Sequence, residues 1–434
     1  MHILFVVPGW PQGSFWDVLR FKFPPLSLAT LIALTPQEHS LTYADESVQP
    51  IPWDSSPDLV AITAMTPLAP RGYEIAETFR QKGSRVVIGG IHASNCPEEA
   101  SQHADSVVIG EADEIWSDII EDARRDALKP FYRQERTTAM GMVPPADRNL
   151  YPPKGYFFEN IIQTTRGCPH RCEFCTVTAF FGGTYRTRPV ERILEEIGSL
   201  NRAPGYVFFA DDNLAANRKH FASLLEELKS CRLRWICQAS ISVASSPELL
   251  QSMAEAGCHG IFIGFESLSE DNLKTMGKSQ NSASFYEEAI KRIHDQGIGV
   301  YGSFIFGYDH DSPDVFDRFL DFANRNRLDG AFLPVLTPFP GTRIHARLEA
   351  EGRILSRDWR LYDMATVVYR PRHMSVDELQ EGFWKVNKGF YSISSTLRRL
   401  FHPASLTRRS NIIFMPMNIG HIPAVRRAHR NLRP

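Results

Sequence analysis

The most informative stretch of this chain is TRGCPHRCEFC, residues 165–175. It sets Cys168, Cys172 and Cys175 in a C-x3-C-x2-C spacing directly after a predicted strand, and thiolates this close together bind a soft metal centre. Three unrelated buried thiols and a zinc ion are the alternatives. A structural zinc normally takes four protein ligands, and no C-x2-C pair or H-x3-H follows at the usual distances. We therefore predict a 4Fe-4S cluster with one iron open to a small molecule.

This motif follows the first strand of a βα series that fills the middle of the chain. Strands are predicted at 160–165, 206–210, 234–239, 260–265, 298–306 and 330–336, and helices at 190–200, 220–229, 247–256, 285–296 and 313–326. Six strands are two short of a full eight-stranded barrel, so we expect a partial (β/α)6 TIM-type barrel. Catalytic groups of such barrels gather at the carboxyl ends of the strands.

Polar side chains do recur at those strand ends. They are Asp211, Asp212 and Asn213 after the second strand, Gln238 and Ser240 after the third, Glu266 after the fourth, Ser303 and Asp309 at the fifth, and Thr337 after the sixth. The barrel rim that carries the cysteines is therefore predicted to be the active site.

Ahead of the barrel, near-continuous apolar runs alternate with helical patterns. Strands are predicted at 2–7, 41–45, 59–64, 85–90 and 106–110, and helices at 26–34, 71–81 and 111–127. Parallel sheets covered on both faces require such runs. We predict α/β architecture throughout: a doubly wound Rossmann-like domain at 1–128, a proline-punctuated linker at 129–158, the barrel at 159–344 and a mostly helical C-terminal region at 345–434.

Composition narrows the class of protein. The 434 residues are 43% hydrophobic and 23% charged, with a net charge of -2, so no global field favours nucleic acid. No run of about 18 apolar residues exists, and the start lacks the layout of a signal peptide. The seven cysteines are an odd count and argue against a disulfide framework. A cytoplasmic enzyme is expected.

The cysteine motif, with Phe174 before its last cysteine, resembles the signature of the radical S-adenosylmethionine (SAM) enzymes. The resemblance implies that Cys168, Cys172 and Cys175 are the catalytic cluster ligands and that the open iron is chelated by SAM. Electron transfer then gives methionine and a 5'-deoxyadenosyl radical. The resemblance further implies SAM contacts at Asp211, Asp212, Asn213, Gln238, Glu266 and Ser303, although each could instead be a hydrogen-bonded structural residue.

The N-terminal domain, with Gly89-Gly-Ile-His-Ala-Ser94 followed by Pro97-Glu-Glu-Ala100 and Gly110-Glu111, resembles the cobalamin-binding domain that one branch of this family carries. The resemblance implies cobalamin contacts at Thr66, Gly89, Gly90, His92, Ser94, Gly110 and Glu111. The D-x-H-x-x-G motif is absent from this domain, so no histidine lower ligand is predicted, and His92 is expected to be a hydrogen-bonding wall. The alternative is a relic domain or an interaction module.

Together these features predict a cobalamin-dependent radical SAM C-methyltransferase acting on an unactivated carbon. A cyclase, ring-contraction or oxidative enzyme with the same cofactors is the first alternative, and a non-catalytic cobalamin or iron–sulfur sensor is the second. The C-terminal stretch resembles the hopanoid-methylase and Mg-protoporphyrin-cyclase-like subgroup. Expected partners are an electron donor such as flavodoxin or ferredoxin and a lipid, tetrapyrrole or natural-product substrate, with no nucleic acid; the sequence does not name the substrate.

The last 38 residues, 397–434, carry eight arginines and no acidic residue. Interleaved apolar residues could place this tail against an anionic membrane. The alternative, which we favour, is a tail that docks on its own chain. Prolines in this stretch argue against a long amphipathic helix.

Overall fold

The apolar runs near the N-terminus form the first of two parallel sheets in the computed structural model, which describes residues 1–19, 22–200 and 205–431. The strand order is β2-β1-β3-β4-β5-β6. The strands are β1 (His2–Val7), β2 (Ser40–Asp45), β3 (Leu59–Thr63), β4 (Arg85–Gly89), β5 (Ser106–Ile109) and β6 (Phe131–Arg133). One apolar cluster lies on each face of this sheet, as expected for a doubly wound domain.

Helices cover the two faces of this first sheet. They are α2 (Leu26–Leu34), α3 (Ala69–Gln81), α4 (Ile91–Asn95), α5 (Pro97–Ala100) and α6 (Trp116–Arg124), whereas the short α1 (Phe15–Val18) packs on the core of the second domain. The helix expected at 111–127 begins only at Trp116, because Glu111 and Asp113 form ion pairs outside the domain. Strand β6 lies in the expected linker, where its three residues are too few to give a periodic pattern.

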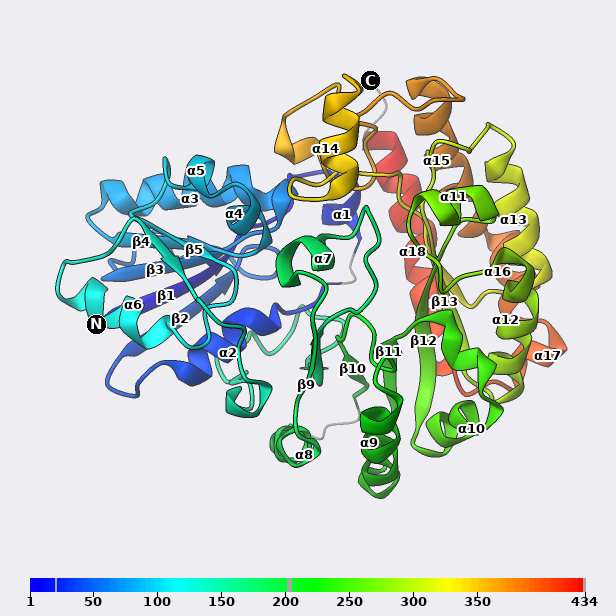
Figure 1. Ribbon diagram of the computed structural model, residues 1–434, viewed down its shortest axis with the longest axis horizontal. Helices are drawn as coiled ribbons and strands as arrows, with labels where there is room; N and C mark the ends of the chain where they lie inside the picture. The colour runs from blue at the N-terminus through cyan, green and yellow to red at the C-terminus, as the bar shows by residue number, and fades with distance from the viewer. Residues whose placement is uncertain (20–21, 201–204, 432–434) are drawn as a thin grey trace.

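The second sheet is the predicted six-stranded one, with the order β7-β10-β11-β12-β13-β14 and every pairing parallel. Its strands are β7 (Asn160–Ile162), β10 (Val207–Phe209), β11 (Trp235–Gln238), β12 (Cys258–Glu266), β13 (Gly299–Phe304) and β14 (Gly330–Phe332). The helices after the strands are α7 (Thr176–Phe181), α8 (Val190–Ser199), α9 (Arg218–Cys231), α10 (Pro247–Glu255), α11 (Glu270–Thr275), α12 (Tyr286–Asp295) and α13 (Val315–Arg325). Figure 1 shows the two sheets side by side, with α7 between them.

The first strand of the barrel is shorter than the predicted span of 160–165. β7 ends at Ile162, and β8 (Thr165–Gly167) leaves the sheet to pair antiparallel with β9 (Tyr185–Thr187). Gly167 has φ +85°, and a Cβ there would collide with the carbonyl oxygen of Thr184. The chain therefore turns out of the barrel just before the first cysteine of the motif.

The C-terminal region is helical, as predicted, and packs on the barrel. It contains α14 (Arg343–Ala350), α15 (Val376–Phe390), α16 (Ile393–Leu400), α17 (Pro403–Leu406) and α18 (Asn411–Asn431). The expectation that prolines prevent a long helix was wrong, since α18 spans 21 residues and contains Pro416 and Pro423. Its buried Ile413, Phe414 and Met417 pack against the barrel, and this packing outweighs the missing backbone donors.

The basic tail is partly an internal structural element. Arg399 is fully buried and donates to the carbonyl oxygens of Leu328 and Phe390, and its burial lowers its pKa to about 10. Arg408 donates to Asp329 Oδ1 at 3.0 Å. Arg433, another of the eight arginines, lies outside the described residues. Among the helices described here, none has the length and apolar character needed to span a bilayer.

We expect Arg399→Ala to lower the free energy of unfolding by about 3 kcal/mol, because the two buried carbonyls lose a charged donor. Arg398→Ala is the matched control, since its exposed neighbouring side chain should contribute less than about 0.5 kcal/mol. Urea denaturation of both variants measures the difference. Equal effects would show that the tail is not anchored through Arg399.

Candidate active site

The three cysteines of the motif lie together on the loop between β8 and α7. All three are free thiols; Cys172 is buried, and Cys168 and Cys175 are half-buried. Burial raises the pKa of each thiol, and the charge of another cysteine of the trio raises it further. The three thiols, within eight residues of one loop, are thus near enough to influence one another electrostatically.

The loop that carries the cysteines is held at its start by a buried carboxylate. Asp211, at the end of β10, accepts hydrogen bonds through Oδ1 from the backbone N–H and hydroxyl groups of Thr164 and Thr165. Its side chain is fully buried, and burial raises its pKa to about 7. In this geometry Asp211 fixes the point where the chain leaves the barrel.

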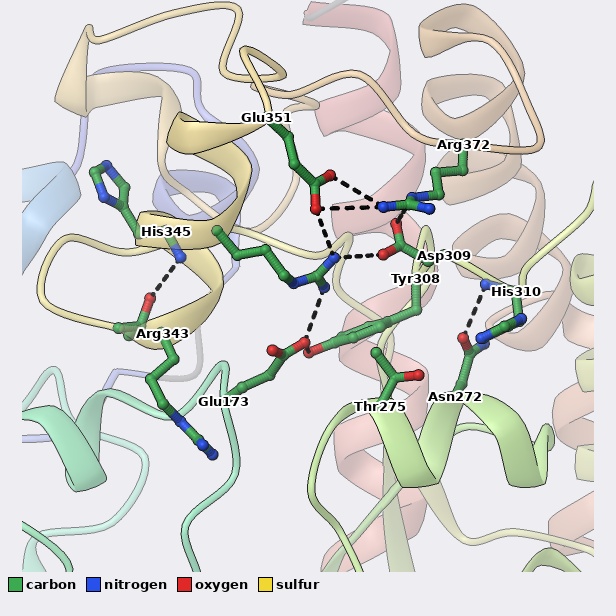
Figure 2. Close-up of polar contacts among 12 residues, drawn as sticks. Glu173, Asn272, Thr275, Tyr308, Asp309, His310, Arg343, His345, Glu351 and Arg372 are labelled. Atoms are coloured by element: carbon green, nitrogen blue, oxygen red, sulfur yellow. Dashed lines mark hydrogen bonds and ion pairs between the residues drawn. The ribbon is translucent and has the colours of Figure 1, made fainter.

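A second set of contacts holds the loop in its middle, at Glu173. The backbone N–H of Glu173 donates to Met276 O at 3.0 Å, and its carbonyl accepts from Ile344 N at 3.1 Å. Its carboxylate accepts from Tyr308 Oη and from Arg347 Nη2, each at 3.0 Å. Figure 2 shows Tyr308 and Glu173 pointing toward each other.

Arg347 joins the Glu173 carboxylate to a wider ion network of the C-terminal region. Its Nη1 lies 2.5 Å from Asp309 Oδ2 and 3.5 Å from Glu351 Oε1, and Arg353 and Arg372 contact the same two carboxylates. Figure 2 shows Arg372 reaching toward Asp309 and Glu351. The cysteine loop is therefore clamped between the barrel and the segment that follows it.

The donor set fits a 4Fe-4S cluster. Three thiols on one short loop match the ligands that such a cluster requires, and the loop is fixed by contacts that do not use the sulfur atoms. Within residues 1–19, 22–200 and 205–431, no three His, Cys, Asp or Glu side chains converge closely enough to hold a single metal ion.

Of the other predicted SAM contacts after the second strand, Asp212 is the one that faces a cavity. Its Oδ2 accepts from Gly167 N at 3.2 Å, and burial raises its pKa to about 6. Asn213 instead uses Oδ1 to accept from Ser240 N at 3.1 Å, which links the second and third strand ends. Asp212 is thus placed to meet a cation, while Asn213 holds the rim.

Glu266 forms the centre of a polar group at the end of β12. Its Oε1 lies 2.5 Å from Lys278 Nζ, and its Oε2 accepts from Ser303 Oγ at 3.2 Å. Glu266 itself has φ +66°, a left-handed conformation that costs energy outside glycine. Gln238 is the last residue of β11, the strand that pairs with β12, and it is half-buried. Glu266 and Ser303 thus lie next to each other at the strand ends, and their contact with SAM stays a prediction.

Lys278 is a site residue that the sequence reasoning missed. Its side chain is only 12% exposed. Its Nζ lies 6.0 Å from the ring centroid of Phe174, the residue that stands between Cys172 and Cys175 in the sequence. Its positive charge lowers the pKa of Cys168 and Cys172, against the larger effect of burial. Lys278 sits between strands in a loop without a motif, so only the fold reveals it.

A cavity of about 400 Å³ separates the two sheets. The first domain lines it with the ends of β3, β4 and β5, including Gly89, Gly90, Gly110 and Glu111, and with α2. The second domain contributes Gln163, Arg166, Val177, Phe180, Phe181 and Asp212. The cavity therefore joins the predicted cobalamin side to the cysteine-bearing rim.

Positive φ angles explain two of the predicted glycines, Gly90 and Gly110, the second with φ +82°. Gly90 has φ +96°, and a Cβ there would lie 2.8 Å from Thr63 Oγ1. Ser94 joins the two glycine turns, since its hydroxyl donates to Gly90 O at 2.8 Å and accepts from Gly110 N at 2.9 Å. Ser94 is thus a support for the cavity wall.

His92 and Thr66 are not among the residues that line the cavity. His92 is buried, and its Nε2 lies 3.3 Å from Glu99 Oε1. Trp359, from the C-terminal region, donates to the same carboxylate at 2.9 Å. Thr66 is buried at the start of a 3-10 helix over Thr66–Leu68. His92 thus forms hydrogen-bonding contacts behind the cavity wall, and its predicted contact with cobalamin stays a prediction.

The two domains meet through a buried ion cluster around Arg166. Its Nη1 lies 2.6 Å from Glu111 Oε1 and 2.7 Å from Asp113 Oδ2, and Arg186 contacts Glu111 at 2.9 Å. Glu111 was predicted as a cobalamin contact, and the structure adds this second role. Sequence reasoning did not single out Arg166, because its acidic partners lie more than 50 residues away.

Comparison with known proteins agrees with this geometry. Residues 162–323 match the Radical SAM superfamily. The chain is 32% identical over 386 residues to a bacteriochlorophyllide d C-12(1)-methyltransferase of Chlorobaculum tepidum, covering 87% of this chain and 84% of that protein. It is 28% identical over 359 residues to the hopanoid C-2 methylase of Rhodopseudomonas palustris, covering 79% and 67%.

Among solved structures, the fold is similar to that of the radical SAM methyltransferase TsrM from Kitasatospora setae with cobalamin and a [4Fe-4S] cluster bound. The TM-score is 0.71 at 15% identity, and the alignment covers 99% of each chain. The similarity therefore extends over both domains and the C-terminal region.

We expect Cys172→Ala to abolish binding of about four irons per chain after anaerobic reconstitution, because a cluster with only two thiolate ligands is not retained. Cys231→Ala is the matched control: it removes a partly exposed thiol on α9, outside the motif. Iron and sulfide analysis, together with absorption spectroscopy, measures the cluster content of both variants. A 4Fe-4S spectrum in Cys172→Ala would refute the ligand assignment.

Proposed function

Because the chain belongs to the radical SAM superfamily, we propose that it is a cobalamin-dependent member that methylates an unactivated carbon. The observation that carries this proposal is the shared cavity, in which the glycine turns of the first domain face Asp212 and Gln163 of the barrel. A methyl donor and a radical source must reach one substrate, and this cavity joins their two predicted sites.

The cluster and SAM are assigned to the rim of the barrel. Cys168, Cys172 and Cys175 would hold the cluster, which supplies an electron that cleaves bound SAM to methionine and a 5'-deoxyadenosyl radical. Asp212 is the carboxylate placed for the SAM ammonium, and Glu266 is the one placed for its ribose hydroxyls. The Lys278–Glu266 pair orients that second carboxylate at 2.5 Å.

Cobalamin is assigned to the cavity side of the first domain, where it would supply the methyl group. Glycines at 89, 90 and 110 bring the backbone close to the cavity without side chains in the way. Apolar side chains of α2 and of the strand ends form most of the remaining wall. These lining residues therefore fit a large, flat ligand that needs no side-chain ligand to its metal.

The substrate is a small molecule. Relatives are named for a bacteriochlorophyllide and a hopanoid, so we propose a tetrapyrrole or a polycyclic lipid as its class. An electron donor such as flavodoxin or ferredoxin remains a prediction. So does peripheral membrane contact through the exposed side of the tail, where Leu397, Phe401 and Ile412 lie near exposed arginines.

We expect the anaerobically reduced protein to convert SAM to methionine and 5'-deoxyadenosine, and Asp212→Asn to weaken SAM binding by roughly tenfold, because a charged contact to the ammonium becomes a neutral one. Chromatography of the products and equilibrium dialysis of SAM measure the two effects. With substrate, methyl-labelled SAM should label the product. Unlabelled, cyclised or oxidised product would favour the alternative enzymes, and no cleavage would favour a sensor.

We expect the purified protein to retain about one hydroxocobalamin per chain, and His92→Ala to change the affinity less than about threefold, because His92 lies off the cavity. Ser94→Ala should weaken binding more, since Ser94 joins the turns that carry Gly90 and Gly110. Gel filtration and EPR of the cob(II)alamin form test this. Loss of a histidine-nitrogen signal in His92→Ala would overturn the assignment.

A further inference from the structure

The cysteine loop, residues 168–175, reaches the molecular surface at one point. Pro169 and Arg171 are its exposed residues, and Arg171 stands directly before the buried Cys172. Each cleavage of SAM consumes one electron, which has to reach the cluster from outside the chain. A protein that delivers this electron must approach where the loop is exposed, because electron transfer requires the two redox centres to lie close together.

Two other elements meet the loop beside Arg171. In the turn after α11, a Cβ on Gly277 would lie 3.3 Å from Arg171 O and 3.7 Å from Arg343 Nη2. In the first turn of α14, Arg343 donates through Nη2 to the same carbonyl oxygen. Figure 2 shows its side chain pointing away from the ion network around Glu351. Gly277 and Arg343 are exposed, and with Pro169 and Arg171 they form what we call the loop surface.

The loop surface has two positive charges without a counterion. In the part of the chain that the structure describes, no carboxylate lies within ion-pairing distance of Arg171 or Arg343. The neighbouring Arg347, Arg353 and Arg372 are different, because each is paired with carboxylates of the network described above. The positive potential is therefore strongest where the cysteine loop is exposed.

The loop surface is separate from the cavity between the sheets. None of its four residues lines that cavity, whose barrel side is formed by Gln163, Arg166, Asp212 and residues of α7. A protein that binds to the loop surface therefore leaves the cavity open to a substrate. Glycine and proline are small, so the surface beside Arg171 has little relief and allows close approach.

We propose that the loop surface, defined by Pro169, Arg171, Gly277 and Arg343, binds an acidic electron-carrier protein that reduces the cluster. The inference rests on the proposed function and names the partner surface of that same site. One electron leaves the reduced carrier and enters the oxidised cluster, and no bond is made or broken. Charge complementarity selects the partner, because the two unpaired guanidinium groups attract an acidic protein, speed its encounter and orient it.

The test measures binding of flavodoxin, a small acidic flavoprotein, to the full chain with its cluster reconstituted. Fluorescence anisotropy of labelled flavodoxin gives the Kd at low salt. We expect Arg171→Gln combined with Arg343→Gln to raise the Kd by roughly tenfold, because both charges are lost. Arg171→Lys combined with Arg343→Lys keeps the charges and should change the Kd less than about threefold. Binding by the unaltered protein should weaken as salt is raised, since exposed charges are screened.

Arg232→Gln combined with Arg409→Gln is the matched control. Both arginines are exposed and lie at the amino ends of barrel strands, since Arg232 precedes β11 and Arg409 donates to Ala254 O ahead of β12. This control should bind flavodoxin as the unaltered protein does. Lys274→Glu reverses an exposed charge just before Gly277 without changing the cysteine loop, and it should raise the Kd severalfold. It decides the outcome if the double glutamine variant loses its iron.

Cleavage of SAM is measured on the same preparations with two reductants. With limiting reduced flavodoxin, cleavage should fall roughly tenfold in the double glutamine variant. With photoreduced 5-deazariboflavin, a small neutral reductant that needs no binding surface, it should stay unchanged.

Equal flavodoxin affinity in the double glutamine, Lys274→Glu and control variants would overturn the proposal. So would the absence of saturable, salt-dependent binding by the unaltered protein. If 5-deazariboflavin drives cleavage while flavodoxin does not bind, the loop surface is wrong and the proposed function stands. If 5-deazariboflavin drives no cleavage in the unaltered protein, the proposed function itself fails.

Discussion

The buried guanidinium of Arg166 pairs with Glu111 and Asp113 of the first domain and stands two residues before Cys168. A buried charge that loses its partner costs on the order of 3–5 kcal/mol, so the two domains are held together at this point. The cavity between the sheets and the cysteine loop are both built around that contact. SAM and cobalamin can act on one substrate only if the two domains that hold them keep a fixed distance, and the Arg166 contact maintains that distance.

The rim is held by groups that do not themselves face the cavity. Asp211 takes up the backbone donors ahead of the loop, and Glu173 receives Tyr308 and Arg347 from the elements that follow. Such supporting contacts keep reacting groups in place, which is the protein's main contribution when cofactors supply the chemistry.

Sequence reasoning predicted both parallel sheets, the six barrel strands and the cysteine cluster on one loop, because each leaves a local pattern of period, spacing or residue type. It missed β6, which is three residues long, and the long helix α18, whose prolines are outweighed by packing on the barrel. It also missed Lys278, which lies in a loop without a motif 12 residues after its partner Glu266, and Arg166, whose acidic partners lie more than 50 residues away. Long-range ion pairs leave no periodic trace, so only the fold assigns them.

The central claim is that the cluster and cobalamin bind in one chain on either side of the same cavity. EPR of the protein reduced to carry both a 4Fe-4S cluster and cob(II)alamin tests this claim most directly. Two paramagnets this near should couple, so the cob(II)alamin signal should be split or relax faster than in Cys172→Ala, which lacks the cluster. Two independent signals, each unchanged by the other centre, would contradict the account.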